Sequence, residues 1–466
     1  MSRVFVRSVT TRSLVLVACD TLLIALSIVL AAYVRLGDLG ARDVLVIENG
    51  AAKALLIAFV AQTCLYYADL YDLRYLADRR ELFTRILQAL SSASFILAAL
   101  YFWFPSLIIG RGVFVIAAFL VIALVIGWRI GFEWMSGRVG PRERLLLVGT
   151  SDAAVTLARE MFERRYELGV EIVGFIDPDP ARMGAPVLNP GVIGTLEDIP
   201  TIVRARSVDR VVVSLADARG KLPMDKLLEM KLDGVSFDHL ASVYEEYTGK
   251  IAVENLRPSW LIFSPGFRKS RVLAAGKRTL DIVAAGLGLI VAAPAMALVA
   301  LATRLTSPGA ILYHQSRVGL HGRIFTLHKF RSMRENAEAD TGPVWASKDG
   351  DTRVTRVGLW LRRSRLDELP QLWNVLKGDM SFVGPRPERP EFVSDLSRQI
   401  PFYGQRHIVR PGLTGWAQVS YSYGSSVEDA LQKLQYDLYY IKNLSLSLDV
   451  FIILNTAKTV LLRKGA

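Results

Sequence analysis

Two adjacent carboxylates lie in the C-terminal part of the chain, within Leu366-Asp367-Glu368-Leu369-Pro370-Gln371. Four nearby cations are candidates for binding phosphate: Lys329, Arg331, Arg362 and Arg386. Cationic side chains neutralise phosphate oxygens, while a carboxylate attacks phosphorus or holds a metal ion. Asp367 and Glu368 beside these cations therefore predict a site for phosphoryl transfer.

A helix is the element expected to position this pair. Apolar residues recur at helical spacing over residues 359–376, which predicts one helix. Arginines at 362, 363 and 365 then lie within two turns of both carboxylates. The turn Gly384-Pro385-Arg386-Pro387 presents a further arginine. The alternative is that the three helical arginines form a basic face on anionic lipid.

The composition limits the class of protein. The chain has 466 residues, of which 52% are hydrophobic and 21% charged, so we expect several domains and contact with lipid, and exclude disorder. The net charge of +12 suits anionic lipid or phosphorylated substrates. No nucleic-acid-binding module is recognisable, so no nucleic acid is expected as a partner. Cys19 and Cys64 lie inside apolar runs, which excludes a disulfide framework and a cysteine-based zinc site.

Four apolar runs in the N-terminal region, 14–34, 54–68, 86–109 and 113–135, predict a four-span bundle over residues 1–140. Ten arginines flank the ends that would lie inside, and four cations flank the other ends. Because cytoplasmic loops are enriched in Lys and Arg, both ends of the bundle are expected in the cytoplasm.

Residues 141–254 alternate strand-like and helical segments, which predicts a Rossmann-like cytoplasmic domain of the type that binds CoA or nucleotides. Its first turn, Gly149-Thr150-Ser151-Asp152-Ala153, lacks the glycines of G-x-G-x-x-G that allow close approach to a pyrophosphate. A structural or regulatory role is therefore preferred to nucleotide binding. Residues 255–276 are expected to form a linker.

A fifth apolar segment, about 280–303, carries cations on both flanks. Both flanks are therefore expected in the cytoplasm, which a re-entrant helix satisfies. Pro294 would form the break, because proline cannot donate its amide hydrogen bond and disrupts the preceding turn. An ordinary kinked span is the alternative.

Residues 277–466 resemble the bacterial sugar transferase family of polyprenyl-phosphate hexose-1-phosphate transferases, the monotopic phosphoglycosyl transferases. The resemblance rests on the motifs quoted above for residues 366–371 and 384–387, together with three others: Lys277-Arg278 followed by Asp281, Lys329-Phe330-Arg331-Ser332-Met333, and Arg410-Pro411-Gly412-Leu413-Thr414-Gly415. The whole chain resembles the long form of this family, which carries a four-span bundle and a Rossmann-like domain before the catalytic unit.

This resemblance implies an enzyme that moves a sugar-1-phosphate from a UDP-sugar to undecaprenyl phosphate and releases UMP. Asp367 would be the nucleophile that forms a covalent phosphosugar intermediate, Glu368 its partner, and Mg²⁺ the cofactor, close to Asp367. The enzyme would start exopolysaccharide or capsule assembly at the cytoplasmic face of the bacterial inner membrane. Membrane lipid, further copies of the chain and polysaccharide-assembly proteins are the other partners that it suggests.

The expected fold class is a membrane α-helical bundle, an α/β Rossmann-like domain and an α-rich (α/β) monotopic catalytic domain with a re-entrant helix. Two other functions stay open. Asp177-Pro178-Asp179 would hold a metal ion in a metal-dependent nucleotide-sugar glycosyltransferase, although such a turn commonly ends a strand. A catalytically inactive membrane sensor or assembly subunit is the second alternative, and intact Asp367, Glu368 and Arg386 argue against it.

Overall fold

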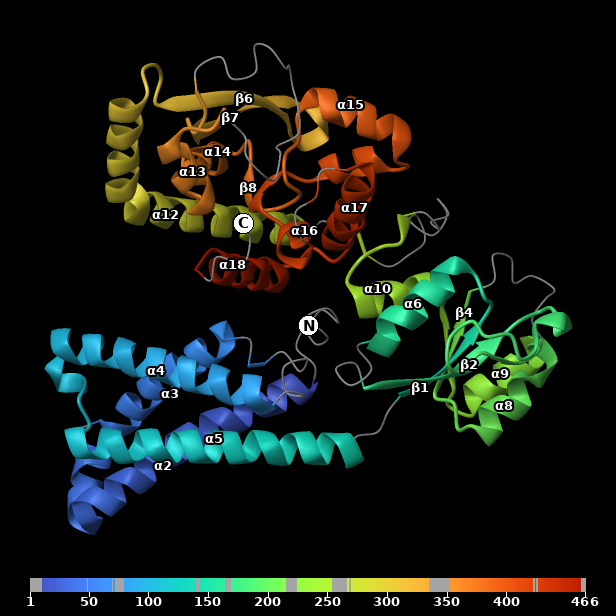
Figure 1. Ribbon diagram of the computed structural model, residues 1–466, viewed down its shortest axis with the longest axis horizontal. Helices are drawn as coiled ribbons and strands as arrows, with labels where there is room; N and C mark the ends of the chain where they lie inside the picture. The colour runs from blue at the N-terminus through green and yellow to red at the C-terminus, as the bar shows by residue number, and fades with distance from the viewer. Residues whose placement is uncertain are drawn as a thin grey trace. The chain divides into compact units, whose positions relative to one another are not determined.

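The computed structural model describes most of the chain, and its two compact units are Val6–Leu240 and Ala241–Ala466 (Figure 1). The described residues are 11–47, 49–68, 70–71, 79–139, 143–163, 169–214, 224–253, 266–267, 270–334, 353–421, 424 and 426–461. Most of the predicted linker, 255–276, lies outside these ranges.

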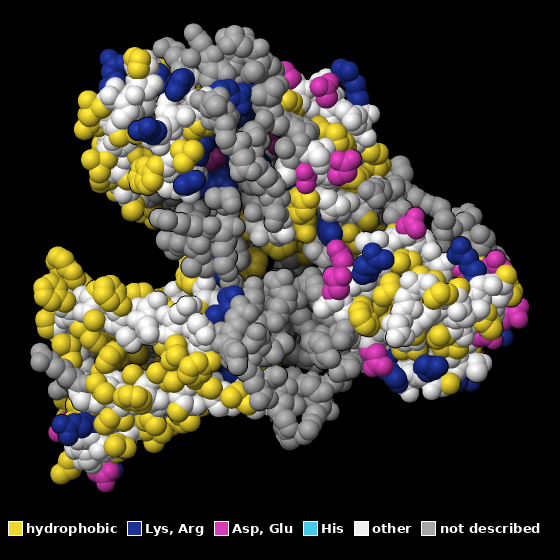
Figure 2. All heavy atoms as spheres, in the orientation of Figure 1, with side chains coloured by type: hydrophobic (Ala, Val, Ile, Leu, Met, Phe, Trp, Pro, Cys, Tyr) yellow, Lys and Arg dark blue, Asp and Glu magenta, His cyan; other side chains and the backbone are white. Residues whose placement is uncertain are grey.

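Long apolar helices open the first unit: α2 (Thr11–Arg42), α3 (Gly50–Tyr67), α4 (Arg79–Trp103) and α5 (Arg111–Val139). By length and composition, each is able to cross a membrane. Apolar residues such as Ala31, Ala58 and Val125 pack inward, while large side chains such as Leu22 and Phe119 are 69% and 72% exposed. Figure 2 shows hydrophobic side chains over the outside of these helices. Such a surface is suited to lipid, and the chain is a membrane protein.

The second part of this unit is a parallel sheet. In the described part of the chain its five strands follow the order β3-β2-β1-β4-β5. Crossover helices join parallel strands and cover the sheet, which is the Rossmann-like arrangement expected from the alternating pattern. The elements are β1 (Glu143–Val148), α6 (Asp152–Glu163), β2 (Val170–Ile176), β3 (Val192–Gly194), α8 (Ile199–Ala205), β4 (Arg210–Val213), α9 (Met224–Leu232) and β5 (Ser236–His239).

The second unit is mostly helical, with two-stranded pairings that hold its loops. Strands β6 and β7 are antiparallel, and β8 and β9 are parallel. Its elements are α10 (Leu240–Thr248), α12 (Arg271–Thr306), β6 (Leu312–Val318), β7 (Ile324–Phe330), α13 (Arg356–Arg363), α14 (Gln371–Lys377), β8 (Ser381–Val383), α15 (Pro390–Gln399), β9 (Gly412–Thr414), α16 (Trp416–Ser420), α17 (Val427–Lys442) and α18 (Leu446–Leu461). These three parts confirm the predicted fold class.

Helix α12 is a fifth helix long and apolar enough to cross a membrane. Its N-terminus is capped by Ser270, whose Oγ accepts from the Leu273 amide at 3.0 Å. Pro294 lies inside the helix, and Figure 1 shows α12 turning sharply into a second arm that leads to β6. Both arms pack on the same unit, since Ala285 and Val299 are buried in two of its apolar clusters.

The single helix predicted over residues 359–376 is wrong. The structure has α13, a 3-10 turn over Leu366–Glu368, and then α14. Arg365 adopts a left-handed conformation with φ of 60°, which ends the first helix. Pro370 stands at the N-cap of α14, where its missing amide hydrogen leaves no helical hydrogen bond unmade. The two carboxylates are consequently on a tight turn between helices.

Candidate active site

The first arm of α12 anchors the site through the Lys277, Arg278 and Asp281 motif. Lys277 Nζ donates to the Val383 carbonyl at 2.9 Å and to Asp449 at 2.7 Å. Arg278 donates to the last carbonyls of α14, those of residues 375 and 376, at 2.7 and 2.6 Å. Asp281 accepts from the Ser381 hydroxyl and the Phe382 amide at 2.9 and 2.8 Å. Two turns of α12 therefore fix both α14 and β8, the elements that flank the site.

Glu368 is held by two cations. Lys329 Nζ on β7 lies 3.2 Å from Glu368 Oε1, and Arg386 Nη2 lies 2.5 Å from the same oxygen. The Asp367 side chain is buried, yet among the described residues no hydrogen bond to its carboxylate is present. The Glu368 carboxylate is thus engaged by two cations. The Asp367 carboxylate is still able to accept hydrogen bonds.

The two carboxylates differ in pKa. Burial raises the pKa of Asp367, and the Glu368 charge raises it further, against the opposing effect of Lys329, Arg362 and Arg386. Burial acts the same way on Glu368, but the charges of Arg386 and Lys329 outweigh it and lower its pKa well below the ordinary value. Glu368 is therefore ionised, and it holds cations close to Asp367.

Glycines let the loop with Arg386 lie directly on the loop after residue 410. A Cβ on Gly412 would stand 2.1 Å from the Gly384 nitrogen, and one on Gly384 would stand 2.5 Å from the Arg410 carbonyl. Side chains are therefore excluded at both positions, and strands β8 and β9 pair here by backbone contact. This contact fixes the direction in which Arg386 leaves its turn.

A buried ion pair that sequence reasoning missed supports the same loop. Arg406 donates to Asp437 Oδ2 at 3.1 and 2.8 Å and to the Arg386 carbonyl at 3.0 Å. Both side chains are almost completely buried. Asp437 lies on α17 outside any motif that we used, so only the long-range contact reveals its role.

The other predicted site residues are placed as follows. Arg362 donates from Nε to the Ser332 hydroxyl at 2.9 Å and lies close enough to act electrostatically on Asp367. Arg331 donates instead to the carbonyls of Ser307 and Pro308, both at 2.7 Å, just after α12 ends. The structure therefore brings Lys329, Arg362 and Arg386 to the carboxylates and engages Arg331 at the end of α12.

A divalent cation suits this arrangement only if a substrate supplies ligands. No group of three His, Cys, Asp or Glu side chains able to hold a metal occurs in the described part of the chain. Mg²⁺ is commonly held by one or two carboxylates together with substrate phosphates. The unengaged carboxylate of Asp367 fits that donor set.

Comparison with known proteins supports an enzyme that transfers phosphoryl groups, the class that the carboxylate pair and its cations indicate. A model of the bacterial sugar transferase family matches residues 272–463, and a model of a CoA-binding domain matches residues 67–227. A UDP-glucose:undecaprenyl-phosphate glucose-1-phosphate transferase of Xanthomonas campestris is 35% identical over 70% of this chain and 68% of its own length. An Escherichia coli protein with the same name is 33% identical over 72% of each chain.

A further relative matches a shorter part of the chain at higher identity. The UDP-N-acetylgalactosamine-undecaprenyl-phosphate N-acetylgalactosaminephosphotransferase of Aeromonas hydrophila is 46% identical over 49% of this chain, which spans 53% of that relative's length. The fold and the site define a membrane enzyme with a carboxylate pair set among cations. The chain belongs to the bacterial sugar transferase family, and it is an enzyme of the sugar phosphotransferase type.

Proposed function

We propose that this protein transfers a sugar-1-phosphate from a UDP-sugar to undecaprenyl phosphate and releases UMP. The names of the relatives support the two substrates. The observation that carries the proposal is the unengaged Asp367 carboxylate beside Glu368, which is bound to Lys329 and Arg386. A nucleophile surrounded by cations is what transfer between two anionic substrates requires.

The mechanism that we infer has two displacements. Asp367 Oδ attacks the phosphorus that carries the sugar, an aspartyl–phosphorus bond forms, and the bond to the UMP oxygen breaks. An oxygen of undecaprenyl phosphate then attacks the same phosphorus, and Asp367 leaves as a carboxylate. Lys329, Arg362 and Arg386 stabilise the charge on the phosphoryl oxygens in both steps. Glu368 keeps two of these cations in place.

We propose Mg²⁺ as the cofactor, which Asp367 and the phosphate oxygens of the donor would hold. When bound, it would supply positive charge to the diphosphate of the donor. Lys329 and Arg386 are already neutralised in part by Glu368, so additional positive charge would assist departure of UMP.

The activity is tested by adding UDP-sugars with and without undecaprenyl phosphate to the purified full chain and measuring nucleotide release. We expect UMP with a matching donor, and a loss of release when EDTA removes Mg²⁺ and recovery when Mg²⁺ is restored. Release of UDP would instead indicate a conventional glycosyltransferase. Release unchanged by EDTA would contradict the proposed cofactor.

Two observations bear on the alternatives. Asp177 accepts hydrogen bonds from the Thr150 hydroxyl at 2.5 Å and from the Asp179 amide at 2.9 Å, so local partners use its carboxylate. A glycosyltransferase metal site at Asp177 is therefore less favoured than a strand-ending turn. The engaged Glu368 and unengaged Asp367 likewise favour an enzyme over an inactive sensor.

We also propose that α12 is re-entrant and that the catalytic unit lies on the cytoplasmic face of the inner membrane. Cations flank both ends of the helix, and Pro294 lies inside it. We expect an impermeant thiol reagent to label Ser270→Cys and Ala310→Cys from the same side, in a chain without Cys19 and Cys64. Labelling from opposite sides would contradict a re-entrant helix.

The biological role proposed on this basis is the first step in assembling exopolysaccharide or capsule repeat units. A polyprenyl diphosphate sugar is a lipid-anchored product to which later transferases can add sugars. Association with further copies of the chain and with polysaccharide-assembly proteins is part of this proposal. Deletion of the gene should then abolish the lipid-linked first sugar in the membrane fraction.

A further inference from the structure

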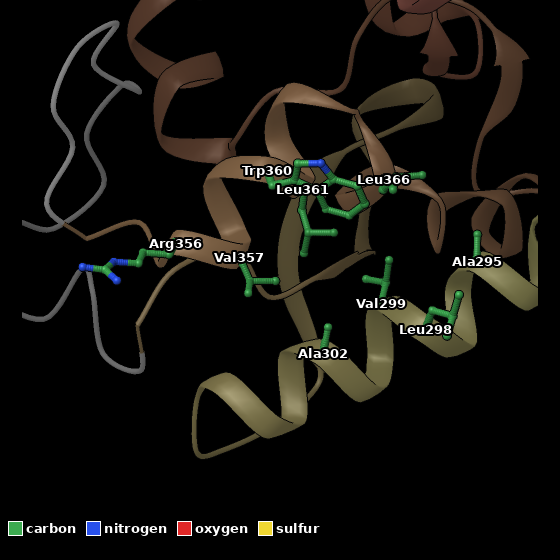
Figure 3. Close-up of a pocket in the computed structure, with 9 residues that line it drawn as sticks. All are labelled: Ala295, Leu298, Val299, Ala302, Arg356, Val357, Trp360, Leu361 and Leu366. Carbon is green, nitrogen blue, oxygen red and sulfur yellow. The ribbon is translucent and has the colours of Figure 1, made fainter.

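An apolar cavity of about 540 Å³ lies between the second arm of α12 and helix α13 (Figure 3). Its volume falls within the range of about 300–1,000 Å³ that is usual for pockets of small ligands. Figure 3 shows α12 along one side and α13 with the following turn along the other. The lining residues are Ala295, Leu298, Val299, Ala302, Arg356, Val357, Trp360, Leu361 and Leu366.

This cavity, which we call the α12–α13 groove, reaches the residue that precedes the carboxylate pair. Leu366 lines it, and the next residue in the chain is Asp367. Arg362 lies on α13 and acts electrostatically on Asp367. A ligand that occupied the groove and carried a phosphate at one end would thus present this phosphate to the cations of the site.

The rim of the groove is suited to lipid. Leu298 is 69% exposed and Trp360 is 57% exposed, although both are large apolar side chains. Among the described residues that line the groove, Arg356 is the one that carries a charge. Because a nucleoside or a sugar would leave its polar groups unpaired against such a lining, the occupant has to be apolar.

We propose that the α12–α13 groove binds the isoprene units nearest the phosphate of the polyprenyl phosphate acceptor. This inference rests on the proposed function and adds to it the site where the hydrocarbon tail of the acceptor binds. One wall belongs to a helix able to enter the membrane, so the chain passes from lipid into the groove without crossing water. The phosphate at its end meets the cations around Asp367, and charge complementarity fixes which end enters.

The groove is tested by filling it. Ala302→Trp places a large side chain among the lining residues, while Ala297→Trp adds the same side chain at an exposed position of α12 that does not line the groove. We expect Ala302→Trp to raise the KM for undecaprenyl phosphate at least about tenfold, the range seen when apolar pocket contacts are lost. Ala297→Trp should leave this KM unchanged.

Stoichiometric UMP release without acceptor serves as the second readout. It should be the same in both variants, because the donor does not enter the groove. An unchanged acceptor KM in Ala302→Trp would overturn the proposal and leave a phospholipid acyl chain as the occupant. Failure of the unmodified protein to release UMP would instead contradict the proposed function.

Photocrosslinking gives a test that does not depend on activity or on the fold of Ala302→Trp. A benzophenone amino acid replaces Leu298, which lines the groove, or Leu301, which is similarly exposed but does not line it. In nanodiscs with radiolabelled undecaprenyl phosphate, we expect labelling at 298 that unlabelled acceptor competes away, and little at 301. Equal labelling at both positions, or labelling that acceptor does not compete, would contradict the proposal.

Discussion

Asp367→Asn should abolish sugar-phosphate transfer while the protein still inserts into the membrane. The asparagine amide has nearly the shape of the carboxylate but cannot form the aspartyl–phosphorus bond. Removal of an essential nucleophile commonly lowers kcat by roughly 10³-fold or more. Because no described residue donates a hydrogen bond to Asp367, the replacement removes no hydrogen bond of that side chain within the described part of the protein. Its effect should therefore be on chemistry and not on stability.

The measurement is UMP release in the absence and presence of undecaprenyl phosphate. Both should be lost in Asp367→Asn, together with the radioactivity that a labelled donor leaves on the denatured protein. Asp395→Asn is the matched control, since Asp395 is an exposed carboxylate on α15 that forms an ion pair 4.0 Å from Arg398. Turnover within about tenfold of the unmodified protein would exclude Asp367 as the nucleophile.

Local motifs allowed the carboxylate pair to be found from sequence. Asp367, Glu368 and Arg386 lie within about twenty residues, and each belongs to a short segment with cations or turn-forming residues. A long apolar helix with an internal proline was also predictable, because length and composition are properties of one segment, although α12 begins at Arg271, before the apolar segment at about 280. What these patterns could not show is that the pair stands on a turn, since the left-handed conformation of Arg365 has no signature in a non-glycine residue.

Contacts between distant segments explain what was missed. Arg331 follows Lys329 by two residues, yet strand β7 ends at Phe330, so the alternation that gives residues two apart the same face no longer applies. Arg331 binds the carbonyls after α12 instead. Arg406 and Asp437 are 31 residues apart and meet only in the folded chain. Neither contact leaves a pattern in its own segment.

Arg386→Ala is expected to lower kcat/KM for the UDP-sugar by about 10²–10³-fold, the range for loss of one preorganised group that stabilises transition-state charge. Arg386 is the closest cation to Glu368, at 2.5 Å, and its turn is held by backbone contact with Gly412 and by Arg406. The arginine is therefore positioned before the donor binds. Arg386→Lys should recover part of the loss, because it restores the charge without the paired N–H donors.

Two comparisons separate a role on the substrate from a role in holding Glu368. Arg363→Ala removes an exposed arginine on α13 and should leave the kinetics unchanged. Glu368→Gln weakens the ion pair from the other side. If Arg386 acted only by holding Glu368, Glu368→Gln alone would match the loss in Arg386→Ala, and the double variant would show no further loss. We expect instead that Arg386→Ala reduces kcat/KM further in the Glu368→Gln background, since the guanidinium also acts on the phosphoryl group. A lower Tm for Arg386→Ala with unchanged kcat/KM would assign Arg386 a purely structural role.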